Sequence, residues 1–255
     1  MRFTPQLRAL DWLLERPMAH RGLHKEKKGR VENCESSFAS AIKHEFSIEC
    51  DIQLTKDGEA VMFHDDTVER VMDGRGAVKD LTLRELKAMK FKEGTDKIQT
   101  LAEFLEQVAG QVTVVIEIKS LWDDDFALTD RAIDVLSDYS GPHALLSFDP
   151  VLIARAADLS PKTIRGINAD RVIDPYYNPL PVSRRLAMRE FSHLPESRPH
   201  FLSFDAAQLP YPFISEFRAM GFPIISWTIR SEDEASAARR WCDQIIFENF
   251  KPELE

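Results

Sequence analysis

Short runs rich in β-branched residues alternate with amphipathic stretches of helical periodicity along the whole chain. This alternation is typical of βαβ units, in which the strands pair in parallel and the helices cover the sheet. We predict eight parallel strands, at residues 17–21, 46–52, 112–119, 143–148, 163–168, 200–205, 223–229 and 244–248. Helical patterns occupy residues 36–44, 83–89, 101–108, 130–137, 183–189, 212–220 and 232–241. Because 255 residues is a length that a single (β/α)8 barrel commonly needs, we expect one α/β domain of the TIM-barrel type over residues 1–255, with two average domains as the weaker option.

A further apolar run, at residues 60–65, follows the second strand after only the short turn Lys56-Asp57-Gly58. So short a connection makes a hairpin rather than a crossover, so this run should be antiparallel to the second strand. We therefore expect an insertion at about residues 53–99. Its hairpin would carry His64 back toward the ends of the barrel strands.

The composition is that of an ordinary globular protein, with 44% hydrophobic and 29% charged residues. The formal net charge of −9 argues against a protein that binds nucleic acid through its phosphate backbone. The three cysteines, Cys34, Cys50 and Cys242, lack the spacing of a zinc site or a disulfide framework, and reduced thiols fit a cytoplasmic protein.

The beginning of the sequence, residues 1–17, has charged residues within its apolar stretch and favours an amphipathic helix over a signal peptide. No run approaches the roughly 18 to 20 apolar residues of a membrane span, so we expect no stable membrane insertion.

Acidic residues follow the apolar parts of two predicted strands. Glu49 and Asp51 are two residues apart, so their side chains face the same side of the sheet, and Glu117 and Lys119 repeat this spacing on the third strand. Charged residues at the carboxyl ends of barrel strands are typical of catalytic sites. Three carboxylates brought together repel one another unless a cation joins them, and oxygen ligands favour Mg²⁺ or Ca²⁺ over Zn²⁺. The alternative is a set of salt bridges at the barrel rim in which Lys119 pairs with a neighbouring carboxylate.

Two histidines lie near the same predicted strand ends, His20 in the first strand and His64 in the hairpin. A lone histidine there is more often structural, but two histidines beside a carboxylate cluster suit paired acid and base work near neutral pH. Arg21 and Lys119 would add positive charge for a phosphate group.

Several motifs occur in the order found in one family of enzymes. They are MAHRG at 18–22, EN at 32–33, ECDIQLTKDG at 49–58, FHDD at 63–66, IEIK at 116–119, DLTLRELKAM at 80–89, IQTLAEFL at 98–105, LLSFDP at 145–150 and ISWTIR at 225–230. With this ordered set the sequence resembles the glycerophosphodiester phosphodiesterase family over nearly its whole length. It departs from the family pattern at Val31, Arg230 and residues 247–248, which bears on substrate choice.

The resemblance implies a role for each matching residue. His20 and His64 would be the general acid and base, with Glu49, Asp51 and Glu117 as metal ligands and Arg21 and Lys119 as phosphate-binding residues. Glu32 and Asn33 match a supporting pair, and Trp227 matches an aromatic residue that walls the substrate pocket. Phe148, also at a predicted strand end, should contribute to the same wall.

The predicted function is metal-dependent hydrolysis of small-molecule glycerophosphodiesters to glycerol 3-phosphate and an alcohol. One alternative is a related phosphodiesterase that acts on lysophospholipids, as a lysophospholipase D does. Another is a non-catalytic barrel that binds phosphodiesters. The sequence leaves open the preferred head group, the choice between Mg²⁺ and Ca²⁺, and which histidine is the acid. It also leaves open whether water or a substrate hydroxyl attacks, and the oligomeric state.

Overall fold

This computed structural model describes residues 10–254. They divide into two compact units, each with its own share of the strands. The first unit comprises residues 18–119 and 126–143, and the second comprises residues 10–17, 120–125 and 144–254.

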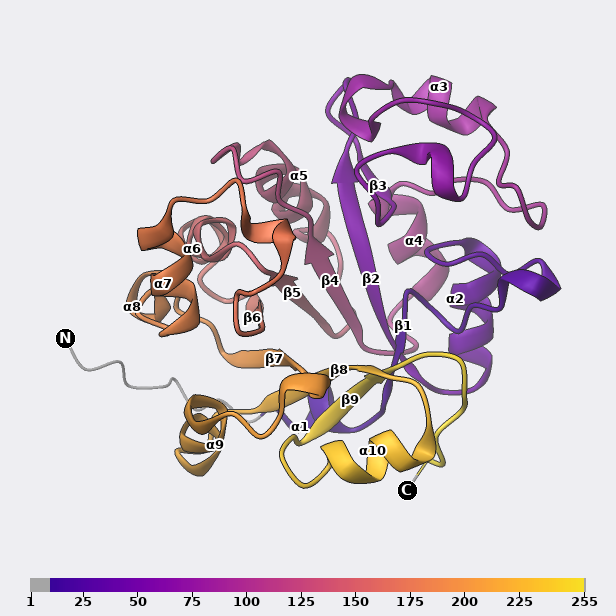
Figure 1. The fold of residues 1–255 in the computed structure, drawn as a ribbon. Helices are drawn as coiled ribbons and strands as arrows, with labels where there is room; N and C mark the ends of the chain where they lie inside the picture. Colours follow the sequence, from indigo (N-terminus) through magenta and orange to yellow (C-terminus); the bar gives the residue numbers. More distant parts are fainter. Residues whose placement is uncertain (1–9, 255) are drawn as a thin grey trace. The chain divides into compact units, whose positions relative to one another are not determined.

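The strands of the first unit are β1 (Met18–His20), β2 (Ser47–Leu54), β3 (Ala60–Met62) and β4 (Val114–Ile118). β2 pairs in parallel with β1 on one side and with β4 on the other. β3 pairs antiparallel with β2 and lies beside it in Figure 1, so the predicted hairpin is confirmed. Gly58 in the turn has a φ of +84°, a left-handed conformation that glycine adopts without a steric penalty.

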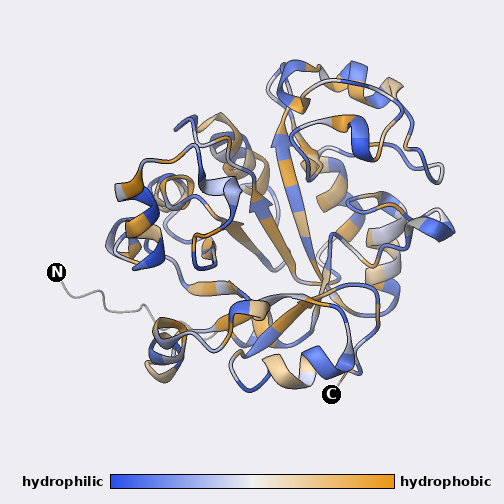
Figure 2. Ribbon diagram, in the orientation of Figure 1, coloured by the Kyte–Doolittle hydropathy of each residue, from blue (hydrophilic) through white to orange (hydrophobic). Residues whose placement is uncertain are grey.

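Strand register in this unit brings predicted site residues onto neighbouring strands. His20 is opposite Glu49, and Asp51 is opposite Glu117. β2 alternates between hydrophobic and hydrophilic colours in Figure 2, as expected when apolar and charged side chains face opposite sides of a strand. The alternation therefore gathers Glu49, Asp51 and Glu117 on one face.

Two of the helices of the first unit, α3 and α4, begin at threonine caps. The α-helices are α2 (Glu35–Lys43), α3 (Leu83–Ala88), α4 (Leu101–Val108) and α5 (Ala127–Leu136), and the 3-10 turns are η1 (Glu26–Lys28), η2 (Val68–Arg70) and η3 (Val78–Asp80). Thr82 and Thr100 each accept a hydrogen bond from the third backbone N–H of their helix, in capping boxes. α5 begins three residues before its predicted start because its first turn is also packed inward, with Leu128 and Thr129 buried.

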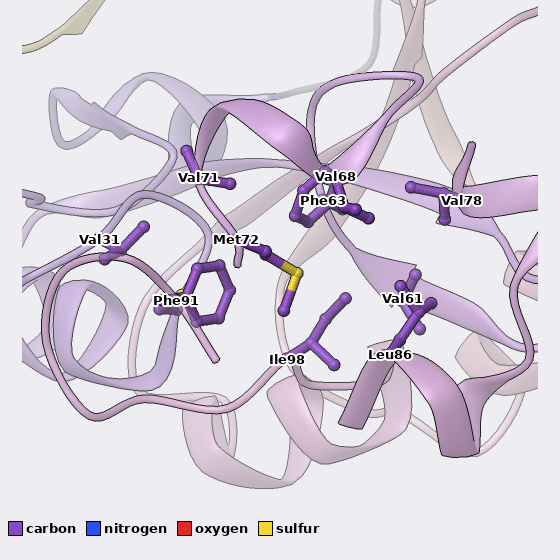
Figure 3. Close-up of a cluster of buried hydrophobic side chains, with 11 residues drawn as sticks. Val31, Val61, Phe63, Val68, Val71, Met72, Val78, Leu86, Phe91 and Ile98 are labelled. Carbon is purple, nitrogen blue, oxygen red and sulfur yellow. The ribbon is translucent and has the colours of Figure 1, made fainter. Parts of the chain in front are cut away.

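The segment after β3 has a small hydrophobic core of its own (Figure 3). Its side chains come from the hairpin, from the turns and helix α3 that follow it, and from the loops before α2 and α4, and they are Val31, Cys34, Val61, Phe63, Val68, Val71, Met72, Val78, Leu86, Phe91 and Ile98. Packing of this kind holds a segment with little regular secondary structure in one conformation. The expected insertion at about residues 53–99 is therefore an ordered part of the first unit.

The second unit contains five parallel strands and the helices between them. Its strands are β5 (His143–Ser147), β6 (Ile164–Ala169), β7 (Phe201–Asp205), β8 (Ile224–Ile229) and β9 (Gln244–Phe247), and each pairs with the next. Its helices and turns are α1 (Asp11–Leu14), α6 (Pro150–Leu159), η4 (Pro175–Tyr177), α7 (Val182–Arg189), α8 (Leu194–Ser197), η5 (Ala206–Gln208), α9 (Pro212–Ala219) and α10 (Glu232–Ala238).

Two elements of the second unit differ from the sequence prediction. α6 was not among the predicted helices, although Asp149 caps it through Val151 and Pro150 occupies its first turn. The amphipathic helix expected over residues 1–17 is represented by α1, and residues 1–9 lie outside the described part of the chain.

The strands and helices of the two units together give the predicted fold class. Eight parallel strands alternate with helices along the chain, as in a TIM-type (β/α)8 barrel, and β3 is an additional antiparallel strand. No helix in residues 10–254 combines the length and the apolar character that a membrane crossing requires.

Candidate active site

Three buried carboxylates meet in the first unit, at β2 and β4. Glu49, Asp51 and Glu117 each offer an oxygen, and these oxygens all lie within 4.8 Å of one another. The strand register accounts for this convergence, since Asp51 and Glu117 are direct neighbours across the pair and Glu49 is on the same face. The predicted carboxylate cluster is therefore present as a compact set of oxygen donors, the ligand chemistry that Mg²⁺ and Ca²⁺ favour.

The electrostatics of the cluster indicate a need for positive charge. Burial raises the pKa of Glu49 well above its usual value, and the charges of Asp51 and Glu117 raise it further. Lys119 donates hydrogen bonds to Asp51 Oδ1 at 2.7 Å and to Glu117 Oε1 at 2.6 Å. Burial alone would raise the pKa of Asp51, but Lys119, His64 and Arg21 hold it well below its usual range.

The sequence predicted salt bridges of Lys119 as the alternative to a metal site, and such salt bridges are present. One ammonium group pairs with two of the three acids, while burial and the charges of the other two acids still raise the pKa of Glu49. The ion pairs and the metal-site interpretation are therefore compatible.

Arg21 connects the carboxylate cluster to Glu32. Its backbone N–H donates to Glu49 Oε2 at 3.3 Å, its Nε lies 3.4 Å from Asp51 Oδ2, and its Nη1 donates to Glu32 Oε1 at 2.9 Å. Burial would lower the pKa of this guanidinium, but the charges of Asp51, Glu32 and Glu49 raise it above the usual value. Arg21 is therefore held charged beside the cluster.

Asn33 fixes Asp51 through two hydrogen bonds. Its Nδ2 donates to Asp51 Oδ2 at 2.8 Å, and its Oδ1 accepts from the Asp51 backbone N–H at 3.1 Å. Asn33 and Arg21 both have left-handed backbone conformations, with φ of +51° and +55°. Such conformations persist where the surrounding contacts impose them, and they concentrate at functional sites.

The two predicted histidines lie at different parts of the first unit. His20 ends β1, and its Nε2 is 4.0 Å from Glu49 Oε2. His64 follows β3, and its Nδ1 is 2.7 Å from Asp65 Oδ1. Both rings are partly accessible, which proton exchange with a substrate requires.

Sequence reasoning assigned no role to Asp65 or Arg70. The guanidinium of Arg70 contacts Asp65 and Glu32 together. Glu32, His64 and Asp65 lie close enough to form a second acidic and histidine group, but Arg70 already supplies a cation to both of its carboxylates. Asp65 was visible in the FHDD motif, whereas Arg70 lies six residues beyond His64 without a regular pattern to mark it.

The two predicted pocket aromatics contact each other in the second unit. The rings of Phe148 and Trp227 are 5.5 Å apart between centroids in a T-shaped arrangement. Tyr176 and Tyr177 pack against Phe148, and Trp122 packs against both tyrosines. The tyrosines were not predicted to belong to this group, because the short turn η4 that carries them has no periodic pattern.

Two of the departures from the family pattern form a pair. Arg230 Nε donates to Glu248 Oε1 at 2.8 Å in the second unit. The unusual residues at these positions therefore compensate each other's charge.

Comparison with known proteins gives the family. The sequence matches the profile of the glycerophosphoryl diester phosphodiesterase family over residues 20–250. The chain belongs to this family. Curated proteins that match the chain include several named glycerophosphodiester phosphodiesterase.

Curated members of the family align with this chain to different extents. A glycerophosphodiester phosphodiesterase of Caldanaerobacter subterraneus subsp. tengcongensis is 42% identical over 111 residues, which are 40% of this chain and 44% of that protein. YhdW of Bacillus subtilis, whose name gives the same activity provisionally, is 26% identical over 230 residues, covering 86% and 88% of the two chains. The chain thus spans under half the length of the first relative and most of the second.

Solved structures of similar proteins agree in fold. A phosphodiesterase of Oleispira antarctica in complex with the product sn-glycerol-3-phosphate superposes with a TM-score of 0.75 at 22% identity, covering 91% of each chain. The glycerophosphodiester phosphodiesterase of Thermotoga maritima gives 0.69 at 24% identity, covering 90% of this chain and 92% of that one. At these identities the likeness establishes the fold of this chain alone.

Proposed function

We propose that this enzyme hydrolyses glycerophosphodiesters to glycerol 3-phosphate and an alcohol in a metal-dependent reaction that uses two histidines. The observation that carries the proposal is the group of Glu49, Asp51 and Glu117, with Arg21 and Lys119 in direct contact with it and His20 at its edge. This arrangement combines a hard cation site, positive charge for a phosphate and proton-transfer groups. The product bound by the Oleispira antarctica protein agrees with this choice of substrate.

The metal proposed for the site is Mg²⁺ or Ca²⁺. Glu49, Asp51 and Glu117 would hold it, since their buried oxygens converge within 4.8 Å of one another and their negative charges repel without a cation. When bound, such an ion polarises a phosphate oxygen and stabilises negative charge.

The remaining charged residues of the first unit have distinct proposed tasks. Arg21 and Lys119 would bind the phosphate oxygens and stabilise the charge that grows during bond cleavage. Glu32 orients Arg21, and Asn33 orients Asp51, through the hydrogen bonds described above.

The histidines would perform the two proton transfers. One of His20 and His64 removes a proton from the attacking oxygen, and the other donates a proton to the departing alkoxide. In the second unit, Phe148 and Trp227 are proposed as pocket residues on the strength of the family pattern and their mutual packing.

The test is turnover of a panel of glycerophosphodiesters and lysophospholipids, with release of glycerol 3-phosphate measured with and without EDTA. Activity on the glycerophosphodiesters should disappear with EDTA and return with Mg²⁺ or Ca²⁺. Turnover of lysophospholipids alone would replace the proposal by the lysophospholipase alternative. Binding without turnover would support the non-catalytic alternative.

The histidine pair has its own test. The dependence of kcat/KM on pH should be bell-shaped, and His20→Ala and His64→Ala should each lower turnover by roughly 10²- to 10⁴-fold. A nitrophenyl phosphodiester, whose leaving group needs no proton, should selectively rescue the variant that has lost the acid. Full activity of both variants on a glycerophosphodiester would refute the mechanism.

A further inference from the structure

His64 is connected to its surroundings through Asp65. The ring Nδ1 lies 2.7 Å from Asp65 Oδ1. Arg70 grips the same carboxylate with two hydrogen bonds, from Nε to Oδ2 at 2.6 Å and from Nη2 to Oδ1 at 3.0 Å. Asp65 is thus held from one side by a guanidinium and presents its Oδ1 to the histidine.

The charge of Asp65 fixes where His64 carries its proton. Burial alone would raise the pKa of Asp65, but the hydrogen bonds from His64 and Arg70 hold it well below its usual range. An ionised carboxylate can only accept hydrogen bonds, so Nδ1 of His64 must be the donor. The Nε2 atom is then left as the atom that exchanges a proton with the substrate.

The other side of Arg70 contacts Glu32. Its Nη1 donates to Glu32 Oε2 at 3.1 Å and its Nη2 to Glu32 Oε1 at 2.5 Å. Glu32 also accepts from Arg21 Nη1 at 2.9 Å. A continuous chain of charged hydrogen bonds therefore runs from His64 through Asp65, Arg70 and Glu32 to Arg21.

The backbone around Arg70 is anchored rather than free. Arg70 ends η2, and its neighbours Val68, Val71 and Met72 are buried in the small core of Figure 3. The backbone carbonyl of Asp66 accepts from the Val78 N–H at 2.9 Å. The guanidinium is therefore presented from a fixed turn.

We propose that Asp65 and Arg70 are positioning residues for His64. Asp65 sets the tautomer and the ring orientation, and Arg70 ties that carboxylate to the Glu32–Arg21 pair. This inference rests on the proposed function, in which His64 transfers a proton and Arg21 binds phosphate. Asp65 and Arg70 would thus support the reaction through other side chains, without contacting the substrate themselves.

The test measures kcat and KM of the Mg²⁺-loaded enzyme for glycerophosphocholine in single and double variants. Asp65→Asn should lower kcat by roughly 10- to 100-fold, the usual scale for residues that orient a functional histidine, and should leave KM nearly unchanged.

A double-mutant cycle separates positioning from general structural damage. If Asp65 acts only through His64, then adding Asp65→Asn to the His64→Ala variant should lower kcat almost no further. Arg70→Lys, which keeps the charge but loses the two-pronged grip, should retain more activity than Arg70→Ala. If Asp65→Asn does not fold, Arg70→Lys can be combined with His64→Ala in a double-mutant cycle of the same design. The matched control is Asp66→Asn, a change to the adjacent exposed carboxylate, which should leave kcat and KM unaltered.

The outcomes are distinguishable. An equal loss of kcat from Asp65→Asn with and without His64, or a loss that appears mainly as a raised KM, would overturn the positioning role while leaving the proposed function intact. Full activity of His64→Ala would overturn the two-histidine mechanism and the positioning role together. A loss of kcat confined to the His64-containing background would support the inference.

Discussion

Replacing Lys119 by Met should destabilise the protein strongly in the absence of a metal. Lys119 is nearly buried, with 12% of its side chain exposed, and its ammonium pairs with Asp51 and Glu117 at 2.7 and 2.6 Å. Methionine has a similar length and no charge. The substitution therefore removes the ammonium group that contacts two of the three carboxylates, while Arg21 still contacts Asp51.

The magnitude follows from these distances. At an effective dielectric constant of about 20, two unit charges at this separation attract by about 6 kcal/mol before the cost of burying the ammonium is subtracted. Removal of one partner from a buried ion pair typically costs about 3–5 kcal/mol. Since domains of this kind are stable by about 5–15 kcal/mol, a substantial fraction of the free energy of unfolding should be lost.

The measurement is urea unfolding at neutral pH in EDTA, followed by tryptophan fluorescence. Lys87→Met is the matched control, because Lys87 pairs with Glu103 at the surface and both side chains are well exposed. Exposed pairs contribute about 0–1 kcal/mol, so this variant should unfold close to wild type.

Added Mg²⁺ or Ca²⁺ provides the second comparison. A cation that binds only the folded state at 100 times its Kd stabilises it by about 2.7 kcal/mol. The added cation should raise the free energy of unfolding of Lys119→Met more than that of wild type, because the ion replaces the missing positive charge. The reasoning is refuted if Lys119→Met loses no more stability in EDTA than Lys87→Met does, or if the added cation stabilises wild type more.

Three further predictions concern activity and pH. Glu49→Gln and Asp51→Asn should lower turnover and metal affinity together, as measured by kinetics and calorimetry, and full turnover after exhaustive chelation would contradict the metal site. Trp227→Ala should mainly raise KM, and a fall in kcat at constant KM would instead place Trp227 in the chemistry. Burial lowers the pKa of His193 to about 4 from its usual 6.5, so the unfolded state binds more protons between these values. The free energy of unfolding should therefore fall by about 3 kcal/mol as the pH drops through this window, and His193→Gln should flatten that part of a urea-derived stability curve. An unchanged slope in the variant would contradict this account.

The carboxylate cluster could be predicted because it depends on strand alternation alone. Glu49 and Asp51 share a face in any regular strand, and a parallel neighbour with Glu117 at its carboxyl end completes the set. The hairpin that carries His64 could also be predicted from the sequence, since the turn at Gly58 is too short for a crossover.

The contacts of Asp65, Arg70 and Glu32 could not be read from the sequence. They depend on how the turn η2 packs, which is decided by side chains that come from distant parts of the first unit. The left-handed backbone conformation of Arg21 could not be predicted either, because a non-glycine residue gives no local sequence signal for it. Likewise, the aromatic packing around Phe148 arises from an irregular segment between β6 and α7.

The separate core in Figure 3 has a consequence for how the enzyme should fail on heating. His64, Asp65 and Arg70 are held by a small apolar group that includes Val68, Met72 and Phe91. Small cores open at lower free-energy cost than the strands of a barrel, and such openings are local events. We expect catalytic activity to disappear at a lower temperature than the secondary structure does. Inactivation of that kind would be reversible on cooling, because the parallel strands would still be in place for the segment to close against.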